Sequence, residues 1–103
     1  PLYVDKNKKY LAFSGIGNNQ SFFDTLIDNN CTVLKTVEFP DHHFFSENDL
    51  NKLKKTASDN NLSLITTEKD FVRIPKEKRD GIECLKVKIK LHNMDKFMHK
   101  LVN

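Results

Sequence analysis

Four short runs of apolar or β-branched residues along this chain have the character of buried strands. We expect these strands at 10–14, 32–39, 62–66 and 84–91, because turn-forming Gly, Pro and Asn residues interrupt the chain between them. In the last run, apolar residues alternate with lysines. This alternation predicts a strand with one solvent-exposed face, near an edge of the sheet.

Segments in which apolar residues recur at helical spacing separate these strands. The first covers 20–29, and either Asn18 or Asn19 is a suitable N-cap for it. The second begins at Ser46, a residue type favoured as an N-cap, and has acidic residues in its first turn, where the helix dipole favours negative charge. The expected buried positions are Phe22, Phe23, Leu26 and Ile27 in the first helix and Leu50, Leu53 and Ala57 in the second.

A helical turn expected at 71–74 and a last helix expected at 93–102 complete an alternating order of strands and helices. Such alternation is typical of βαβ crossovers and a mostly parallel sheet. The predicted fold class is therefore α/β, with a four-stranded sheet and flanking helices in three layers, like half of a Rossmann fold. A length of 103 residues suits one domain, which we expect to span 1–103.

Composition narrows the classes of function. Hydrophobic residues make up 38% and charged residues 30% of the chain, which favours a folded domain over disorder. The net charge is only +3, without a dense basic cluster, so we do not expect a nucleic-acid partner. Cys31 and Cys84 lie far apart, and we expect two unpaired thiols in a reducing cytoplasm. Because the chain begins at Pro1 rather than Met, we expect it to be a piece of a longer protein.

Polar segments follow three of the predicted strands, at 14–19, 41–46 and 66–70. Ligands of parallel sheets bind beyond the carboxyl ends of the strands, so these segments should meet at one edge of the domain. In the first segment, Gly15, Gly17 and Asn18 could let backbone N–H groups approach a phosphate at a helix N-terminus. A tight turn without ligand explains the same glycines, and no P-loop motif follows them.

The triplet Asp41-His42-His43 is the most distinctive candidate for chemistry. A carboxylate beside an imidazole can hold one tautomer for proton transfer. Neighbouring loop residues point in different directions, so we expect at most one of the two histidines to face a site. A metal site is not expected from this triplet alone, because three or four convergent ligands are usually needed.

The third segment, Thr66-Thr67-Glu68-Lys69-Asp70, places two hydroxyls, a cation and two acids at a helix start. These side chains could line a phosphate or substrate edge. Helix capping by Thr67 with Asp70 is the simpler explanation, and Lys69 could then be a solvated charge.

Together the three segments resemble one family. Its pattern is A-F-x-G-I-G-N, then F-x-D-H-H-x-[FY], then T-T-E-K-D, and the chain carries all three in this order between Ala12 and Val72. The chain is thus similar to the C-terminal part of tetraacyldisaccharide 4'-kinase, the lipid A 4'-kinase of Gram-negative bacteria. Residues 73–103 match this family only in general character.

This resemblance implies transfer of the γ-phosphate of ATP, with Mg²⁺, to the 4'-hydroxyl of a tetraacyldisaccharide 1-phosphate, on the cytoplasmic face of the inner membrane. It implies an N-terminal lobe with the P-loop, the metal-binding acids and an aspartate base. The histidine that pairs with this base falls on His42 in preference to His43, and Asp41 would orient it. The P-loop and the metal-binding acids do not occur in this chain, so we expect the chain alone to be inactive and to bind neither ATP nor Mg²⁺ tightly.

Two alternatives remain open on the sequence. The chain could be a stand-alone binding module for a phosphorylated ligand or a protein partner, with the three strand-end segments as its pocket. It could also be a metal-dependent phosphoesterase of the kind named for an Asp-His-His triplet, which would need further aspartates at other strand ends.

Overall fold

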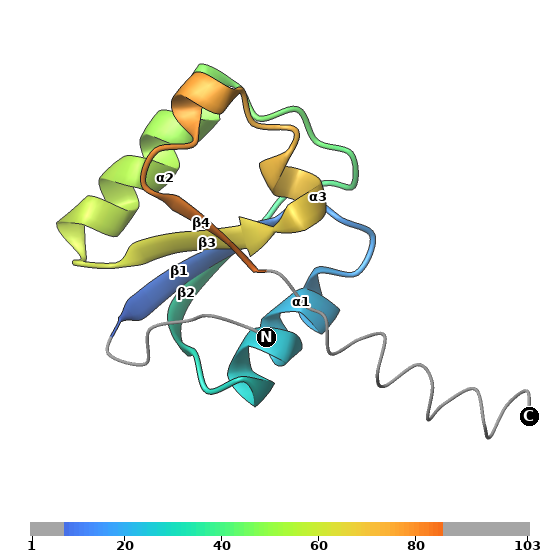
Figure 1. Ribbon diagram of the computed structural model, residues 1–103, viewed down its shortest axis with the longest axis vertical. Helices are drawn as coiled ribbons and strands as arrows, with labels where there is room; N and C mark the ends of the chain where they lie inside the picture. The colour runs from blue at the N-terminus through green and yellow to red at the C-terminus, as the bar shows by residue number, and fades with distance from the viewer. Residues whose placement is uncertain (1–7, 86–103) are drawn as a thin grey trace, which may run out of the picture.

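The computed structural model describes residues 8–85, which form a sheet with helices on both of its faces (Figure 1). The elements in chain order are β1 (Lys9–Ser14), α1 (Asn19–Asp28), β2 (Thr32–Glu38), α2 (Glu47–Asp59), β3 (Ser63–Thr67), α3 (Glu68–Phe71), the 3₁₀ turn η1 (Lys76–Lys78) and β4 (Ile82–Leu85).

The four described strands form one sheet in the order β2-β1-β3-β4, and every pair is parallel. The predicted α/β class with a parallel sheet is therefore confirmed. The last strand lies at an edge, as the alternation of its residues predicted, but it begins at Ile82 instead of Cys84. Its predicted continuation to Leu91 and the predicted helix at 93–102 lie outside the described residues.

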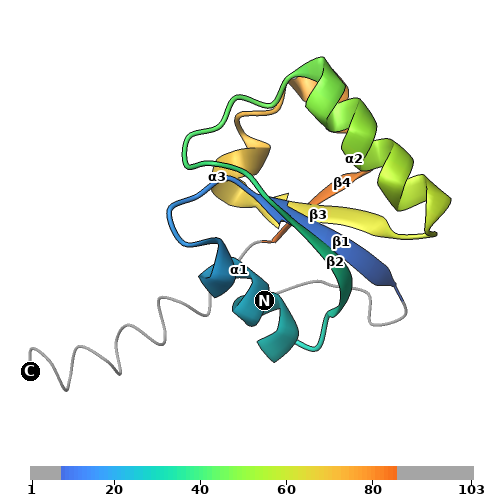
Figure 2. The same cartoon turned by 180° about the vertical axis from the view of Figure 1, so that it is seen from behind.

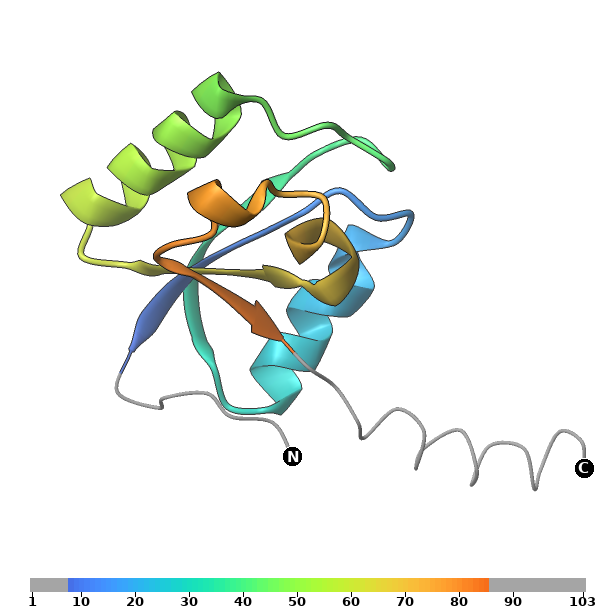
Figure 3. The ribbon, with the colours of Figure 1, turned by 45° about the horizontal axis from the view of Figure 1, so that its top comes forward.

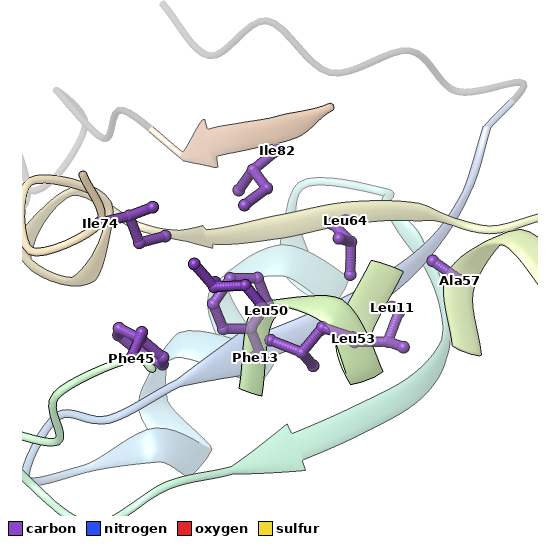
Figure 4. Close-up of a cluster of buried hydrophobic side chains, with 9 residues drawn as sticks. All are labelled: Leu11, Phe13, Phe45, Leu50, Leu53, Ala57, Leu64, Ile74 and Ile82. Carbon is purple, nitrogen blue, oxygen red and sulfur yellow. The ribbon is translucent and has the colours of Figure 1, made fainter. Parts of the chain in front are cut away.

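Side chains of β1 point alternately to the two faces of the sheet, which builds a core on each face. Leu11 and Phe13 pack with Leu50 and Leu53 of α2, in the cluster that Figure 4 shows. Tyr10 and Ala12 of the same strand pack on the opposite face with Phe22, Phe23 and Leu26 of α1. The three layers are seen from behind in Figure 2 and tilted in Figure 3, where α1 and α2 lie on opposite sides of the strands.

Caps fix the starts of the two long helices. The Asn18 side chain accepts the Ser21 N–H at 3.0 Å and is the N-cap of α1. Ser46 and Asp49 form a reciprocal capping box at the start of α2. An asparagine with positive φ follows each of these helices, Asn30 at 65° and Asn61 at 56°. Asparagine tolerates this left-handed conformation, so Asn30 and Asn61 are suited to end the helices.

Two large apolar residues are exposed, and one of them had been expected to be buried. Ile27 in α1 is 59% exposed, so its assignment to the buried stripe was wrong. It lies one residue beyond Leu26, and that rotation carries its side chain to the outer face of the helix. Leu34 is 57% exposed because β2 is an edge strand.

Cys31 is buried, Cys84 is partly buried, and neither forms a disulfide. Burial, and to a smaller extent the negative charge of Glu83, raises the pKa of the Cys31 thiol above its ordinary value. Among residues 8–85, no helix has both the length and the apolar character needed to cross a membrane.

Candidate functional site

The loops that follow β1, β2 and β3 meet at the carboxyl ends of these strands. The backbone N–H of His42, in the loop after β2, donates to the carbonyl of Gly15, after β1, at 3.1 Å. The N–H of Gly15 in turn donates to Oδ2 of Asp70, in α3 after β3, at 3.1 Å. The predicted meeting of the three segments at one edge of the sheet is therefore confirmed.

Close packing at Gly15 requires a glycine. A Cβ atom there would lie 2.9 Å from the Pro40 carbonyl oxygen and 3.3 Å from the Cβ of His43. The backbone amides of this turn already have partners, since Gly15 donates to Asp70 and Ile16 donates to Oδ1 of Asn19. The tight-turn interpretation thus accounts for Gly15, while phosphate binding near Gly17 and Asn18 stays a prediction.

Asp70 is the buried centre of this edge. Its side chain is fully buried, and Oδ2 accepts both the Gly15 N–H and the Thr67 hydroxyl, the latter at 2.7 Å. Its other oxygen, Oδ1, is buried without a hydrogen bond, but Nη1 of Arg73 forms an ion pair with it at 3.6 Å. A buried carboxylate is costly unless it is paired, so these partners hold the β1 and β3 loops together.

The other residues of the third segment divide between structure and surface. Thr66 is fully buried, and its hydroxyl donates to the carbonyl of Phe13 in the neighbouring strand at 2.7 Å. Thr67 caps α3 by accepting the Asp70 N–H at 3.0 Å, as the capping interpretation predicted. Glu68 and Lys69 are exposed.

His43 is packed into the domain. Its ring stacks on Phe39 with centroids 4.7 Å apart, and Nε2 lies 2.8 Å from Oδ2 of Asp49. The side chain is 27% exposed. The hydrogen bond from His43, followed by that from the Ser46 backbone, lowers the pKa of Asp49 below its ordinary value. These contacts tie the loop after β2 to the first turn of α2.

His42 points the other way and is 78% exposed. It occupies the turn after Pro40, in which the His43 N–H bonds back to the Pro40 carbonyl at 3.1 Å. Its φ is +63°, a left-handed conformation that is uncommon for residues other than glycine, although Asn, Asp and His adopt it more often than the rest, and that often occurs at functional sites. Of the two adjacent histidines, only His42 exposes most of its side chain to solvent.

Arg73 is the partner of His42 that the sequence did not reveal. Its Nη2 lies 3.1 Å from Nδ1 of the imidazole. Asp41, which the family resemblance suggested as the orienting residue, places Oδ2 3.6 Å from Nε2 of His42, beyond hydrogen-bond distance. Arg73 lies just beyond the T-T-E-K-D segment, and no spacing rule connects it with a histidine 31 positions earlier.

A pocket of about 430 Å³ opens between the first turns of α1 and α3. This volume lies within the range of small-molecule sites. Neither His42 nor Arg73 lines it, so the predicted edge residues fall into two neighbouring groups. The pocket is lined by Ile16, Gly17, Asn18, Ser21, Phe22, Thr25, Thr67, Glu68, Lys69 and Leu85.

Metal ligands do not gather in the part of the chain that the structure describes. Within residues 8–85, no three His, Cys, Asp or Glu side chains come close enough together to hold a metal ion. The metal-dependent phosphoesterase interpretation therefore gains no support from the fold.

Known proteins are similar in sequence to this chain over nearly its whole length. The sequence pattern of the family described as Tetraacyldisaccharide-1-P 4'-kinase matches residues 3–103. A tetraacyldisaccharide 4'-kinase of Rickettsia bellii is 43% identical over 98 residues, which cover 95% of this chain and 30% of that protein. The protein of the same name from Rickettsia akari is 38% identical over the same shares.

A more distant relative with the same name also matches nearly the whole chain. The tetraacyldisaccharide 4'-kinase of Pelagibacter ubique is 33% identical over 105 residues, which cover 99% of this chain and 33% of that protein. The chain thus spans about a third of the length of these relatives. Their names give no support to a stand-alone binding module. No solved structure matches the chain significantly.

Proposed function

Because the chain belongs to the tetraacyldisaccharide-1-P 4'-kinase family, we propose that it is the C-terminal lobe of a lipid A kinase. The whole enzyme would transfer the γ-phosphate of ATP to the 4'-hydroxyl of a tetraacyldisaccharide 1-phosphate. The match to only a third of each relative supports a lobe that works with a further part of the enzyme. We place this enzyme at the cytoplasmic face of the inner membrane, as the family resemblance suggests.

ATP and Mg²⁺ belong, in this proposal, to the N-terminal lobe. The chain has no G-x-x-x-x-G-K-[ST] sequence to bind phosphates, and the described residues gather no set of metal ligands. The amides of Gly15 and Ile16 are also bonded within the chain. We therefore assign Gly15 and Ile16 no step that involves the nucleotide or its metal ion.

The contribution of this lobe to the reaction would be the imidazole of His42. Phosphoryl transfer depends mainly on positioning and on compensation of charge, and a carboxylate base works better when a neighbouring group holds it in place. The observation that carries the proposal is the opposite orientation of the two histidines: His42 is 78% exposed at the meeting point of the three loops, whereas His43 is packed against Phe39. His42 can therefore pair with an aspartate from the N-terminal lobe.

The proposal is tested with His42→Ala and His43→Ala in the whole enzyme. We expect His42→Ala to lower the turnover number by about a hundredfold, because general acid–base groups contribute at least that much, and to change the affinity for ATP little. His43→Ala serves as the matched variant, and we expect it to reduce thermal stability more than turnover. An unchanged turnover number in His42→Ala, or the reverse ranking of the two variants, contradicts the proposal.

A further inference from the structure

We infer that Arg73 is a positioning residue that selects the tautomer of His42, so that the exposed ring nitrogen donates a hydrogen bond to the partner carboxylate. The inference rests on the proposed function for what His42 does in catalysis. The choice of tautomer itself follows from contacts within this chain.

The guanidinium group of Arg73 is held at its inner side by buried groups. Its Nη1 donates to the Gly15 carbonyl at 3.3 Å and forms an ion pair with the buried Oδ1 of Asp70 at 3.6 Å. The backbone N–H of Arg73 also donates to the Asp70 carbonyl at 3.0 Å. These contacts fix the position of the planar group, and its other terminal nitrogen, Nη2, lies 3.1 Å from Nδ1 of His42.

The chemistry of the two groups determines where the proton of the ring lies. A guanidinium has only N–H donors and does not lose a proton in proteins. Nδ1 of His42 must therefore accept through its lone pair, and the neutral ring carries its proton on Nε2. Nε2–H is then a donor, and a carboxylate, which can only accept, is the group that it suits. The nearby carboxylate of Asp41 lies 3.6 Å from Nε2, too far to accept this hydrogen bond.

The backbone reinforces this orientation of the ring. The His42 N–H and the Arg73 side chain both donate to the Gly15 carbonyl, so one acceptor fixes the turn and the guanidinium relative to each other. Arg73 thus contacts residues of all three loops, Gly15, His42 and Asp70. A purely structural role of Arg73 would require its contacts with Gly15 and Asp70 but not its bond to His42.

The tautomer is measured on this chain by ¹⁵N NMR of the histidine rings, with the His42 signals assigned from His42→Gln. We expect the wild-type chain to show an unprotonated Nδ1, a protonated Nε2 and a coupling across the bond between Nη2 of Arg73 and Nδ1. In Arg73→Met, a fraction of His42 rings should carry the proton on Nδ1. A proton on Nδ1 in the wild-type chain overturns the inference without any variant.

Two further variants separate tautomer selection from folding and from charge. Arg73→Lys keeps a cation beside Asp70 but lacks the second terminal nitrogen that reaches His42, so it should fold and still show the mixed tautomers. Arg79→Met is the matched control: Arg79 also bonds backbone carbonyls, those of Ile74 and Val72, but does not contact His42. The inference is overturned if the His42 ring signals in both Arg73 variants match those of the wild type. It is also overturned if Arg79→Met changes the His42 ring signals as much as the Arg73 variants do.

In the whole enzyme, we expect Arg73→Met to lower turnover by about tenfold and to have no further effect when His42 is already replaced by Gln. If Arg73→Met lowered turnover by the same factor in the wild-type and His42→Gln enzymes, Arg73 would act independently of the imidazole, against the inference. If turnover is unaffected by His42→Ala, the proposed function fails, but the NMR measurement still decides whether Arg73 selects the tautomer.

Discussion

The buried carboxylate of Asp70 accepts the backbone N–H of Gly15 at 3.1 Å, which joins residues 55 positions apart in the sequence. The same carboxylate accepts the hydroxyl of Thr67 and pairs with Arg73. Asp70 therefore does more than cap its own short helix, because it fixes the loop after β1 relative to the loop after β3. The exposed His42 depends on this arrangement, since its backbone bonds to Gly15.

Asp70→Asn should destabilise the domain by about 2 kcal/mol, because it weakens hydrogen bonds to a charged group and leaves Arg73 without its ion-pair partner. The free energy of unfolding in urea measures this loss. The control is Glu68→Gln, which neutralises an exposed carboxylate in the same turn and should change stability by less than about 0.5 kcal/mol. Similar losses in the two variants would refute a special role of the buried carboxylate.

The stability that Asp49 contributes should depend on pH. Its pKa in the folded domain lies below the ordinary value of 3.8, so near that pH the unfolded chain binds more protons than the folded one. The contribution is therefore complete above pH 3.8 and is lost as the pH falls through the folded pKa. We expect Asp49→Asn to be less stable than the wild type at neutral pH, and the gap to narrow at low pH in urea unfolding series.

Glu47→Gln is the matched control for Asp49, because Glu47 lies in the same turn of α2 but takes no part in the capping box with Ser46. Its effect on the free energy of unfolding should be smaller than that of Asp49→Asn at neutral pH. A gap between wild type and Asp49→Asn that is constant from neutral to acid pH would contradict the assignment of the hydrogen bonds from His43 and Ser46.

The left-handed backbone of His42 predicts an unusual order of stability among its variants. At a φ of +63° a side chain with a Cβ is strained, whereas glycine is not. His42→Gly should therefore be more stable than His42→Ala by about 1 kcal/mol in thermal or urea unfolding, although both lose the imidazole. In the whole enzyme, the two variants should lose turnover to the same degree.

His43 provides the comparison, because it is not among the described residues with positive φ. There the ordinary order should hold, with His43→Ala more stable than His43→Gly. If glycine were the poorer substitution at both positions, backbone strain at His42 would not be a property of the folded chain in solution.

Local patterns were sufficient for most of the fold. The apolar runs identified the strands, and the β-α alternation predicted parallel pairing, since a crossover helix between strands leaves few other arrangements. Side-chain caps such as Ser46 and Asn18 were visible in the sequence because they act on residues only three positions away. The exposure of Ile27 was missed, because spacing defines a face of the helix but not its width.

The candidate site was predicted less completely. The three loops could be assigned to one edge, because the carboxyl ends of parallel strands coincide. Which histidine points outward was decided by packing, as His43 stacks on Phe39 and bonds to Asp49. Arg73 could not be found, because it reaches His42 only through the folded positions of Gly15 and Asp70.

The amino-acid sequence by itself thus determined the order of elements, the two apolar faces of the sheet and the edge where polar residues collect, all of which follow from periodicity and short-range capping. The tertiary structure alone decided that Asp70 is buried beneath that edge and that Arg73 joins it to His42. The physical reason is that these bonds link residues tens of positions apart, so they form only where three separate loops are brought to within hydrogen-bond distance.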